Sequence, residues 1–599
     1  MASDQPRKLR SRLRLRRVLP AFVAAAGLCA LGCGAQRFPL RDPLWHDTDK
    51  RPVHVNCKIA PDDDDPKHVS CAPEPYVSPL AWDAADNSIF RPLSKVFAVD
   101  PPGEAKNVNA FDEVPDSAWF QNRIGRVHPP IEDLSRGACS EHEMLDGATA
   151  TPGSWFIDQG KTNGASKGFR IKVGGKQKYM LKADLKEQPE RPSAASAIGA
   201  AIYHAVGFNT SCEQIVYFDP KVLKLKPGLT VTDNSGVTRK FDDKALEGVL
   251  AGATHKDGLI RMQASAWLPG YLLGPFRYEG TRWDDPNDVI PHEERRDLRG
   301  ARLVAAWLNH FDAREQNTMD SWISLDPKKN DSSPGYVRHY YLDTSDSFGS
   351  EWADDGISRR LGRSYLLDFG DIGTDFITFG ALERPWERAR REPGYESFGY
   401  YHHRDFDPEA WKNEYPNPAF SRASERDNAW MARILSRFTR EDIEALVKLG
   451  KFSQPKDTEF LTEVLEQRLW RILDRYLTQL SPLADLRAPG GDMLCATDVA
   501  RARTVRASTA FRYSAKIETD GSPTATPLTV TVKPQGEICM TLPHKVLPSG
   551  IGDVSPPYSV VTIDNGVSRY VLRAHLYDLG MARGGFRLVG IERPEETFE

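Results

Sequence analysis

The sequence has few cysteines, no excess of basic residues and no long apolar run. Eight of its 599 residues are cysteine, and no two of them form the Cys-x-x-Cys pair that is typical of zinc and redox sites. Lysine and arginine number 79 against 83 acidic residues, which argues against a dedicated nucleic-acid-binding protein. No uninterrupted apolar run reaches about 18 residues, so the sequence predicts no membrane-spanning helix.

The composition that is present is that of a globular protein. Hydrophobic residues make up 40% of the chain and charged residues 27%, which excludes wholesale disorder. At roughly 100–200 residues per domain, the length predicts about three to four domains.

The N-terminus has the pattern of an export signal. Seven of the first 17 residues are Lys or Arg, and an apolar stretch from Val18 to Gly32 follows. The end of this stretch, Ala30-Leu31-Gly32-Cys33, resembles a bacterial lipobox, which implies removal of residues 1–32 and lipidation of Cys33. An ordinary cleaved signal peptide is the alternative. Gly34, in place of Asp, implies an outer-membrane lipoprotein of the cell envelope that faces the periplasm or the cell surface.

Six cysteines remain in the mature chain. An even number in an oxidising compartment predicts up to three disulfides, for which about fifteen connectivities are possible. Cys57 and Cys71 are near neighbours, as are Cys495 and Cys539, which leaves Cys139 with Cys212. This pairing is our working hypothesis.

Composition and periodicity divide the rest of the chain. Residues 33–110 are rich in Pro and Asp and predict a tether with little periodic structure. Alternating apolar residues predict strands at 169–173, 179–182 and 214–218. The apolar spacing from residue 193 to 206 predicts a helix that ends at Gly207.

The second half predicts helices and then strands. We expect a helix over 293–309, a hairpin of strands 322–325 and 337–342, and helices within 440–480. After residue 488 come short alternating runs separated by turn residues, including Asn565-Gly566, which predict a small all-β, sandwich-like domain. The predicted fold class is α+β.

Two glycine- and lysine-based features point to phosphate binding. Gly160, Gly164 and Gly168 punctuate a loop between two predicted strands, where backbone N–H groups can approach phosphate oxygens closely. Lys182 ends a strand, from which an ammonium group can reach the phosphates of a nucleotide. A flexible hairpin loop and an exposed lysine are the structural alternatives.

Two further features follow a predicted helix. His310, Asp312 and Asn317 fit the spacing His-x-Asp-x-x-x-x-Asn of a kinase catalytic loop, in which the Asp accepts the hydroxyl proton and the Asn binds a metal. Asp343 closes the hairpin strand that comes next, where its carboxylate can bind Mg²⁺.

Together these features resemble a divergent protein-kinase fold, similar to the atypical kinases of the HipA, CotH and secretory-pathway type. The stretches 284–293, 305–310 and 341–349 also resemble exported lipoproteins of myxobacteria and other delta-proteobacteria. The resemblance implies a kinase-like N-lobe over 111–280 and a largely helical C-lobe over 281–487, followed by the β domain over 488–599. In it Asp343 takes the place of the Asp in Asp-Phe-Gly, although Thr344 and Ser345 replace Phe and Gly.

Two of these assignments have alternatives. A literal Asp368-Phe369-Gly370 lies further along the chain, but Asp343 directly follows the hairpin strand and is the preferred metal ligand. Kinases pair the strand Lys with a helix Glu. The predicted helix contains no Glu. Glu187 and Glu190 precede it, and Glu190 at its start is the expected partner of Lys182.

The resemblance implies Mg²⁺-dependent transfer of a phosphoryl group from ATP to a hydroxyl acceptor. Asp312 is then the base, with His310 in the same catalytic loop, and Asn317 and Asp343 hold the metal. The alternative is a catalytically inactive kinase-like module that binds a ligand or protein at the cell envelope. The expected partners are the membrane, through the lipid on Cys33, and a protein or glycan, through the C-terminal β domain.

Overall fold

The computed structural model describes residues 37–55, 57–60, 67–95, 103–161, 166–232, 237–544 and 555–595. The described residues from 43 onward belong to one compact unit. Helices and sheets alternate along this unit, which confirms the α+β class. Among the described residues, no helix combines the length and apolar character that crossing a membrane requires.

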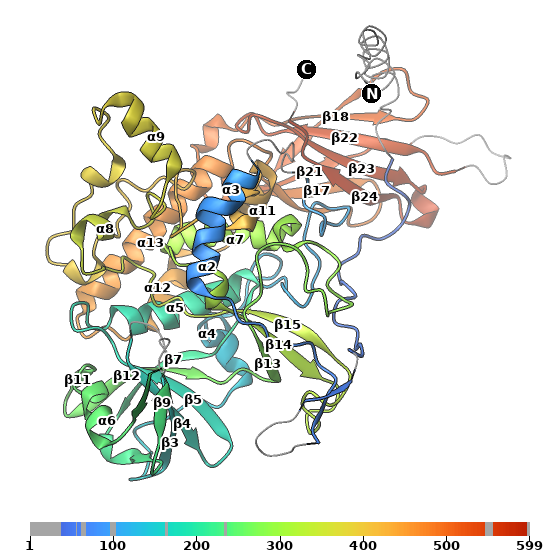
Figure 1. Cartoon of the computed structure of the whole chain (residues 1–599). Helices are drawn as coiled ribbons and strands as arrows, with labels where there is room; N and C mark the ends of the chain where they lie inside the picture. Colours follow the sequence, from blue (N-terminus) through green and yellow to red (C-terminus); the bar gives the residue numbers. More distant parts are fainter. Residues whose placement is uncertain are drawn as a thin grey trace, which may run out of the picture. The chain divides into compact units, whose positions relative to one another are not determined.

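The largest sheet contains the strands that carry Gly160, Gly168 and Lys182 (Figure 1). Its strand order is β11-β12-β5-β4-β3-β8, with β7 also paired to β12, and all pairs except β3–β8 are antiparallel. A loop of Gly174, Gly175 and Lys176 joins β4 to β5, and both glycines have the positive φ that residues with a side chain rarely adopt. The strands are β3 (Trp155–Gly160), β4 (Gly168–Val173), β5 (Gln177–Lys182), β7 (Glu213–Phe218), β8 (Leu223–Leu225), β11 (Thr254–Lys256) and β12 (Leu259–Ala266).

Helix α5 (Arg191–Val206) covers this sheet and packs against β7 and β12. Its many alanines leave room for close packing, and all of its residues except His204 are buried. Gly207 ends the helix, as the sequence predicts. Ser196 donates to the side chain of Gln263 on β12 at 3.0 Å, so the helix is also fixed to the sheet by a polar contact.

A helical layer holds the main hydrophobic core. Helix α7 packs against α11 and α13, and Trp307 Nε1 donates to the carbonyl of Leu465 at 2.8 Å. Ser424 and Thr439 cap α11 and α12 with the reciprocal hydrogen bonds of a capping box. The helices of this layer are α7 (Arg296–Leu308), α11 (Glu425–Leu435), α12 (Arg440–Lys448) and α13 (Pro455–Tyr476).

A four-stranded sheet sets the position of the catalytic-loop candidates. Its order is β13-β14-β15-β6, and Thr318 at the start of β14 pairs with Tyr341 at the end of β15. The chain just before β14 and the chain just after β15 therefore lie side by side. The strands are β6 (Asn209–Thr210), β13 (Tyr271–Gly274), β14 (Thr318–Ser324) and β15 (Gly335–Tyr341).

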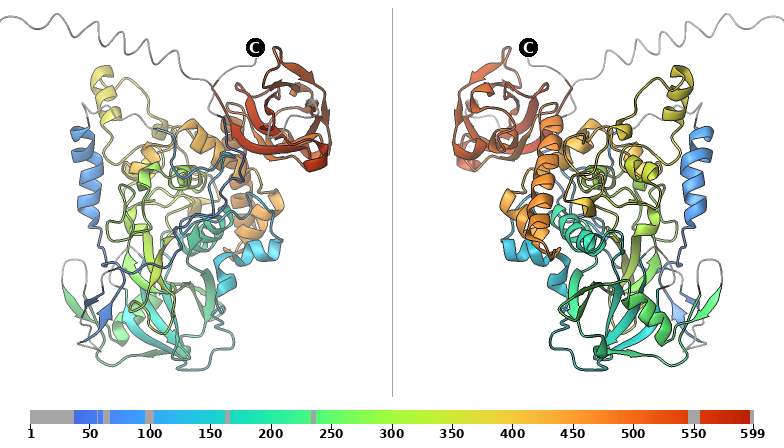
Figure 2. Two further views of the ribbon diagram at one scale, coloured as in Figure 1. Left: turned by 90° about the vertical axis from the view of Figure 1, so that its right-hand side faces the viewer. Right: turned by 90° about the vertical axis from the view of Figure 1, so that its left-hand side faces the viewer.

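The C-terminal strands form two antiparallel sheets of order β16-β17-β21-β20 and β19-β18-β22-β23-β24, with a shared hydrophobic core. Figure 2 shows these strands at the opposite end of the unit from the largest sheet. Strand β18 begins only at Ser514, because Ser508–Ala510 form a 3-10 turn. The strands are β16 (Leu483–Arg487), β17 (Met493–Asp498), β18 (Ser514–Thr519), β19 (Thr526–Leu528), β20 (Val530–Val532), β21 (Glu537–Thr541), β22 (Tyr558–Asp564), β23 (Leu572–Asp578) and β24 (Phe586–Glu592).

The described residues within 43–95, here called the N-terminal strap, run along the surface of the unit and hold more regular structure than their tether-like composition predicts. The Asp49 carboxylate accepts the backbone N–H of Ala118 at 2.9 Å, and Val53 forms a β-bridge with Gly335. The strap contains β1 (Lys58–Ile59), β2 (Val69–Ser70), α2 (Leu80–Ala85) and α3 (Arg91–Ser94).

Shorter elements complete the unit. Helix α9 carries Asp368 at its N-cap and α4 packs against α5. These elements are α4 (Ile131–Arg136), β9 (Thr230–Thr232), β10 (Thr238–Lys240), α6 (Asp243–Leu250), α8 (Asp355–Arg360), α9 (Phe369–Thr378), α10 (Pro418–Ser421) and α14 (Val499–Ala502).

Three disulfides are formed, and their pairing is the one expected from the sequence. Cys57 is bonded to Cys71, Cys139 to Cys212, and Cys495 to Cys539. Disulfides of this number are typical of proteins in an oxidising compartment, which agrees with a secreted or envelope protein.

Candidate functional site

Lys182 and Asp343 meet at the centre of the candidate site. Lys182 is the last residue of β5, and its Nζ donates to Asp343 Oδ2 at 2.9 Å. Asp343 follows β15 by two residues and has a φ of 45°, a left-handed conformation that is uncommon for a residue with a side chain. Such backbone conformations often occur at functional sites. The side chain of Lys182 is 13% exposed and that of Asp343 is 35% exposed, so solvent reaches this pair from the carboxylate side.

The charges at this pair favour ionised groups. Burial alone would raise the pKa of Asp343, but Lys182 and the hydroxyl of Ser345 outweigh it and hold that pKa below its usual value. Burial would lower the pKa of Lys182, but Asp343 outweighs it and raises that pKa. Lys161, at the end of β3, has its pKa lowered to about 8 by burial and by the charge of Lys182. Two cations and one carboxylate therefore converge here.

The catalytic-loop candidates lie on the neighbouring turn. Asn317 Nδ2 donates to the main-chain carbonyl of Asp312 at 2.8 Å, which closes the loop between the two residues. The backbone N–H of Leu342 donates to the carbonyl of Asn317 at 2.9 Å. The loop is therefore joined directly to the segment that carries Asp343, and the structure brings Lys182, Asp312, Asn317 and Asp343 into one region.

His310 and Asp346 lie beside Asp312. The His310 side chain is fully buried, and its Nδ1 is hydrogen-bonded to the hydroxyl of Tyr203 at 3.0 Å. The backbone N–H of Asp312 donates to Asp346 Oδ2 at 3.1 Å. Burial would raise the pKa of Asp312, but His310 and Arg314 outweigh it and lower that pKa, whereas burial and the charge of Asp312 raise the pKa of Asp346 well above its usual value.

Glu190 does not contact Lys182, and the expected pairing of the two is wrong. Its carboxylate accepts hydrogen bonds from the backbone N–H and hydroxyl of Ser453, because Glu190 precedes the first residue of α5 and faces the helical layer. Glu213 on β7 is the acid whose charge acts on Lys182 and helps to raise its pKa. Gln263 and Ser265 donate to the Glu213 carboxylate at 2.7 and 2.6 Å. Strand β12, which carries both donors, lies between β5 and β7, so the acid comes from the sheet and not from the helix.

The glycines of the predicted phosphate loop have structural roles. A side chain at Gly168 would lie 2.2 Å from the carbonyl oxygen of Leu181, and one at Gly160 would overlap Val231 and Phe241. Gly168 therefore needs to be glycine for close strand pairing, and Gly160 for packing against Val231 and Phe241. Gly164 lies outside the described residues, as does Cys33. Their predicted roles stay predictions.

Asp368 lies in another environment. Its carboxylate caps helix α9 by accepting the N–H groups of Gly370 and Asp371, and Lys412 Nζ donates to it at 2.5 Å. The Asp-Phe-Gly sequence at this position thus begins a surface helix, and Asp343 is the carboxylate beside Lys182.

The N-terminal strap also contacts the loop that carries the candidate residues Asp312 and Asn317. Ser78 Oγ donates to Glu315 Oε2 at 2.8 Å. Gln316 Nε2 donates to Ser78 Oγ at 2.7 Å and to Asp83 Oδ2 at 3.2 Å, and Tyr415 donates to the same carboxylate. The strap therefore covers the side of the loop that carries Glu315 and Gln316.

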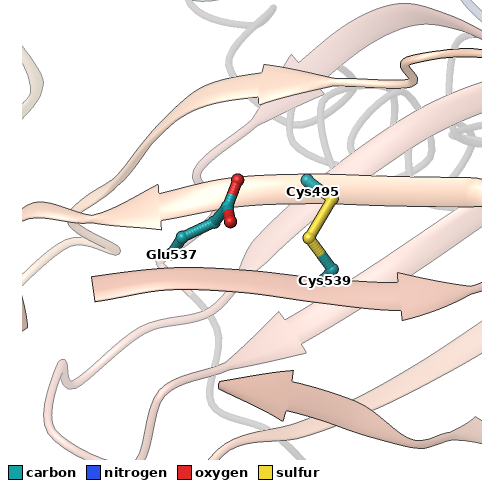
Figure 3. Close-up of side chains that lie close together, drawn as sticks. All are labelled: Cys495, Glu537 and Cys539. Atoms are coloured by element: carbon teal, nitrogen blue, oxygen red, sulfur yellow. A yellow bond between two sulfur atoms is a disulfide. The ribbon is translucent and has the colours of Figure 1, made fainter. Parts of the chain in front are cut away.

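Another group of side chains has the residue types of a metal site, but its members already form other bonds. Cys495 and Cys539 are directly opposite each other on β17 and β21, and Glu537 lies two residues before Cys539 (Figure 3). The two sulfurs are bonded to each other, so neither is a thiolate ligand. The Glu537 carboxylate forms ion pairs with Arg487 and Lys533.

Three residues of the site were not singled out in the sequence: Asp346, Glu213 and Lys161. Asp346 lies three residues after Asp343, so the short acidic spacing was a signal for it. Glu213 reaches the site through strand pairing and carries no local motif, whereas Lys161 lies in the glycine loop Gly160–Gly168. No protein-family model, no curated protein and no solved structure matches this chain.

Proposed function

We propose that this protein is a kinase-like enzyme that transfers a phosphoryl group from ATP to a hydroxyl acceptor with Mg²⁺. The observation that carries the proposal is the convergence of Lys182, Asp312, Asn317 and Asp343 from three distant segments. Phosphoryl transfer depends mainly on positioning and on neutralising charge, and these are the residue types that do so in kinases.

The residues present fit a magnesium–nucleotide complex. Asp343 and the side-chain oxygen of Asn317 are the hard oxygen ligands that Mg²⁺ prefers. Lys182 and Lys161 are cations next to them that can bind phosphate oxygens. When bound, the metal would neutralise charge that develops on the phosphates. The Lys182–Asp343 ion pair keeps both groups charged and in place until a ligand separates them.

Asp312 is the base in this proposal. Its pKa is lowered by His310 and Arg314 against the effect of burial, so it is ionised at neutral pH and can accept a hydroxyl proton. Its amide N–H is held by Asp346 and its carbonyl by Asn317, which fixes the backbone on both sides. The side chain is 20% exposed, so an acceptor can approach it.

The order of the elements supports a two-lobed arrangement. A hairpin with glycines at its ends, β3–β4, precedes the strand with Lys182 and the helix α5, and the loop Asp312–Asn317 and Asp343 follow the buried helix α7. This order agrees with that of the corresponding parts in protein kinases. We assign the largest sheet with α5 to the N-lobe and the helical layer to the C-lobe.

We propose that the protein is located at the outer membrane and is anchored there by a lipid on Cys33. The lipobox-like sequence and the three disulfides support it. Cys33→Ser should release the protein from the membrane fraction in its native host, and a variant that stays membrane-bound would contradict lipidation at this residue.

The decisive experiment measures ATP binding with and without Mg²⁺ and then transfer of labelled phosphate. We expect Asp312→Asn to keep Mg²⁺–ATP affinity within about threefold and to lose transfer at least a hundredfold, because the base acts in the transition state. Wild-type protein that binds no nucleotide would instead favour the inactive binding module.

A further inference from the structure

Three buried ligand atoms point at one another next to the catalytic loop. His310 Nε2 lies 3.5 Å from Asp312 Oδ1 and 3.5 Å from Asp346 Oδ1. All three atoms lie within 4.8 Å of one another. Each is buried, and within the part of the chain that the structure describes none of the three has a hydrogen-bond partner. Buried polar atoms are nearly always satisfied, so three such atoms at one point require an explanation.

The distances fit a shared ion better than hydrogen bonds. An N–H···O hydrogen bond spans about 2.7–3.2 Å, so 3.5 Å is too long. Two ligands that each lie about 2.1 Å from the same ion at a tetrahedral angle are about 3.4 Å apart. Both His–Asp separations are close to this value.

Each of the three side chains is held in place through its other polar atom, the one that does not face the cluster. His310 Nδ1 is bonded to the hydroxyl of Tyr203, and when Nδ1 carries the proton the lone pair of Nε2 is directed at the two carboxylates. Asp346 Oδ2 accepts the backbone N–H of Asp312. Asp312 Oδ2 faces Arg314 Nη2 at 3.6 Å. The remaining atom of each side chain therefore faces the cluster.

The negative charges of the carboxylates in this cluster also favour a bound cation. Asp312 and Asp346 are two carboxylates in contact with one buried imidazole, and like charges in a buried site are unfavourable. Arg314 is shared with Glu414, and Arg191 Nη1 donates to the carbonyls of Ser345 and Ser347. Arg314 is thus divided between Asp312 and Glu414, and Arg191 is engaged elsewhere, so a dication would complete the neutralisation of both carboxylates.

We propose that His310, Asp312 and Asp346 bind one divalent transition-metal ion of the Zn²⁺ or Mn²⁺ class. One imidazole and two carboxylates are the ligands that such ions accept, whereas Mg²⁺ prefers oxygen alone. This site is distinct from the magnesium–nucleotide site at Asn317 and Asp343, and it does not depend on nucleotide. The ion binds Oδ1 of Asp312, which leaves Oδ2, beside Arg314, for the acceptor, and it fixes the catalytic loop to the chain after Asp343.

The test uses the purified full-length protein without nucleotide. We expect one bound equivalent of Zn²⁺ or Mn²⁺ by elemental analysis after dialysis, and visible absorption of bound Co²⁺ that reports a protein site with a histidine ligand. His310→Gln and Asp346→Asn should each weaken Co²⁺ binding at least tenfold. Wild-type protein that takes up no stoichiometric metal and gives no Co²⁺ absorption would overturn the proposal without any variant.

A matched control comes from another buried histidine–aspartate pair. His339 Nδ1 is bonded to Asp320 Oδ1 at 2.6 Å in the four-stranded sheet, so His339→Gln removes the same chemical group outside the cluster and should leave Co²⁺ affinity unchanged. Asp343→Asn should also keep Co²⁺ binding, which separates this site from the nucleotide site. Co²⁺ affinity that is lost in Asp343→Asn and kept in folded Asp346→Asn would place the ion elsewhere and contradict the proposal.

Discussion

Lys182 and Asp343 are separated by 161 residues and form a 2.9 Å ion pair between the largest sheet and the segment after β15. Neither residue is fully enclosed, so a charged ligand can reach the contact. Because each group keeps the other ionised, the pair presents a carboxylate and an ammonium at the same place.

Asp343→Asn should weaken Mg²⁺-dependent ATP binding at least tenfold, since an amide does not offset the charge of the metal. Asp368→Asn is the matched control, because it changes an equally short carboxylate that caps α9. It should leave nucleotide binding unchanged and keep the cap of α9, because Asn caps a helix N-terminus about as well as Asp. Calorimetric titration with Mg²⁺–ATP compares the two, and the reverse ranking would place the metal at Asp368.

Glu213→Gln should reduce phosphoryl transfer at least tenfold, because Glu213 supplies a negative charge that raises the pKa of Lys182. Without this charge the pKa of Lys182 falls, so the alkaline limb of the pH–rate profile should move to lower pH. Glu190→Gln should keep the profile and lose stability through its contacts with Ser453. A profile that moves in Glu190→Gln and not in Glu213→Gln would restore the helix-side acid as the partner.

Removal of the Cys139–Cys212 bond should cost about 4 kcal/mol of stability, because the bond closes a long loop in the unfolded chain. The two cysteines are 73 residues apart, whereas Cys57 and Cys71 are 14 apart. Loss of the shorter bond should cost about 3 kcal/mol. Denaturant unfolding of the paired Ser variants measures both, and a larger loss for Cys57–Cys71 would show that native-state contacts outweigh loop length.

Asp285→Asn should stabilise the protein at pH 7 by about 2–3 kcal/mol. Burial raises the pKa of Asp285 to about 6, and Asp288 and Asp320 add to the effect. The Asp285 carboxyl therefore binds its proton more tightly in the folded state than in the unfolded chain. As a result, the free energy of unfolding falls as pH rises from about 4 to about 6. Asn keeps the oxygen that accepts the backbone N–H of Asn287.

The gain from Asp285→Asn should disappear at pH 4, where the Asp is already neutral. Thermal unfolding across this pH range tests the expectation. Asp288→Asn is the neighbouring control and should destabilise, because Asp288 binds the ring of His292 at 2.7 Å. Equal stability of wild type and Asp285→Asn at pH 7 would contradict the raised pKa.

The sequence predicted the parts of the fold and site that depend on local spacing. Strand and helix periodicity located β4, β5, α5 and β7, and the fixed spacing from His310 to Asn317 located the loop. The disulfide pairs followed from short separations within a segment. These features are encoded by neighbours in the chain.

Contacts between distant segments could not be predicted in the same way. The charge of Glu213 acts on Lys182 because β12 lies between the strands that carry these two residues. Pairing between strands that are distant in the chain produces no characteristic residue spacing in the sequence. Gly160 and Gly168 resembled a phosphate loop because glycine also serves close packing of strands. The strap looked like a linker because its contacts, such as Asp49 with Ala118, involve polar residues that are equally common in solvated chain.

The attachment of the strap has a mechanical consequence. A chain pulled from its N-terminal side would load the Asp49–Ala118 hydrogen bonds and the Val53–Gly335 bridge before the force reached Ser78. The Cys57–Cys71 disulfide prevents the chain between these two residues from being extended under tension. The backbone N–H of Cys71 donates a hydrogen bond to the carbonyl of Asp331. Tension on the N-terminal side of the strap is thus borne by these contacts, and the loop beneath Ser78 that carries Glu315 and Gln316 is shielded from it.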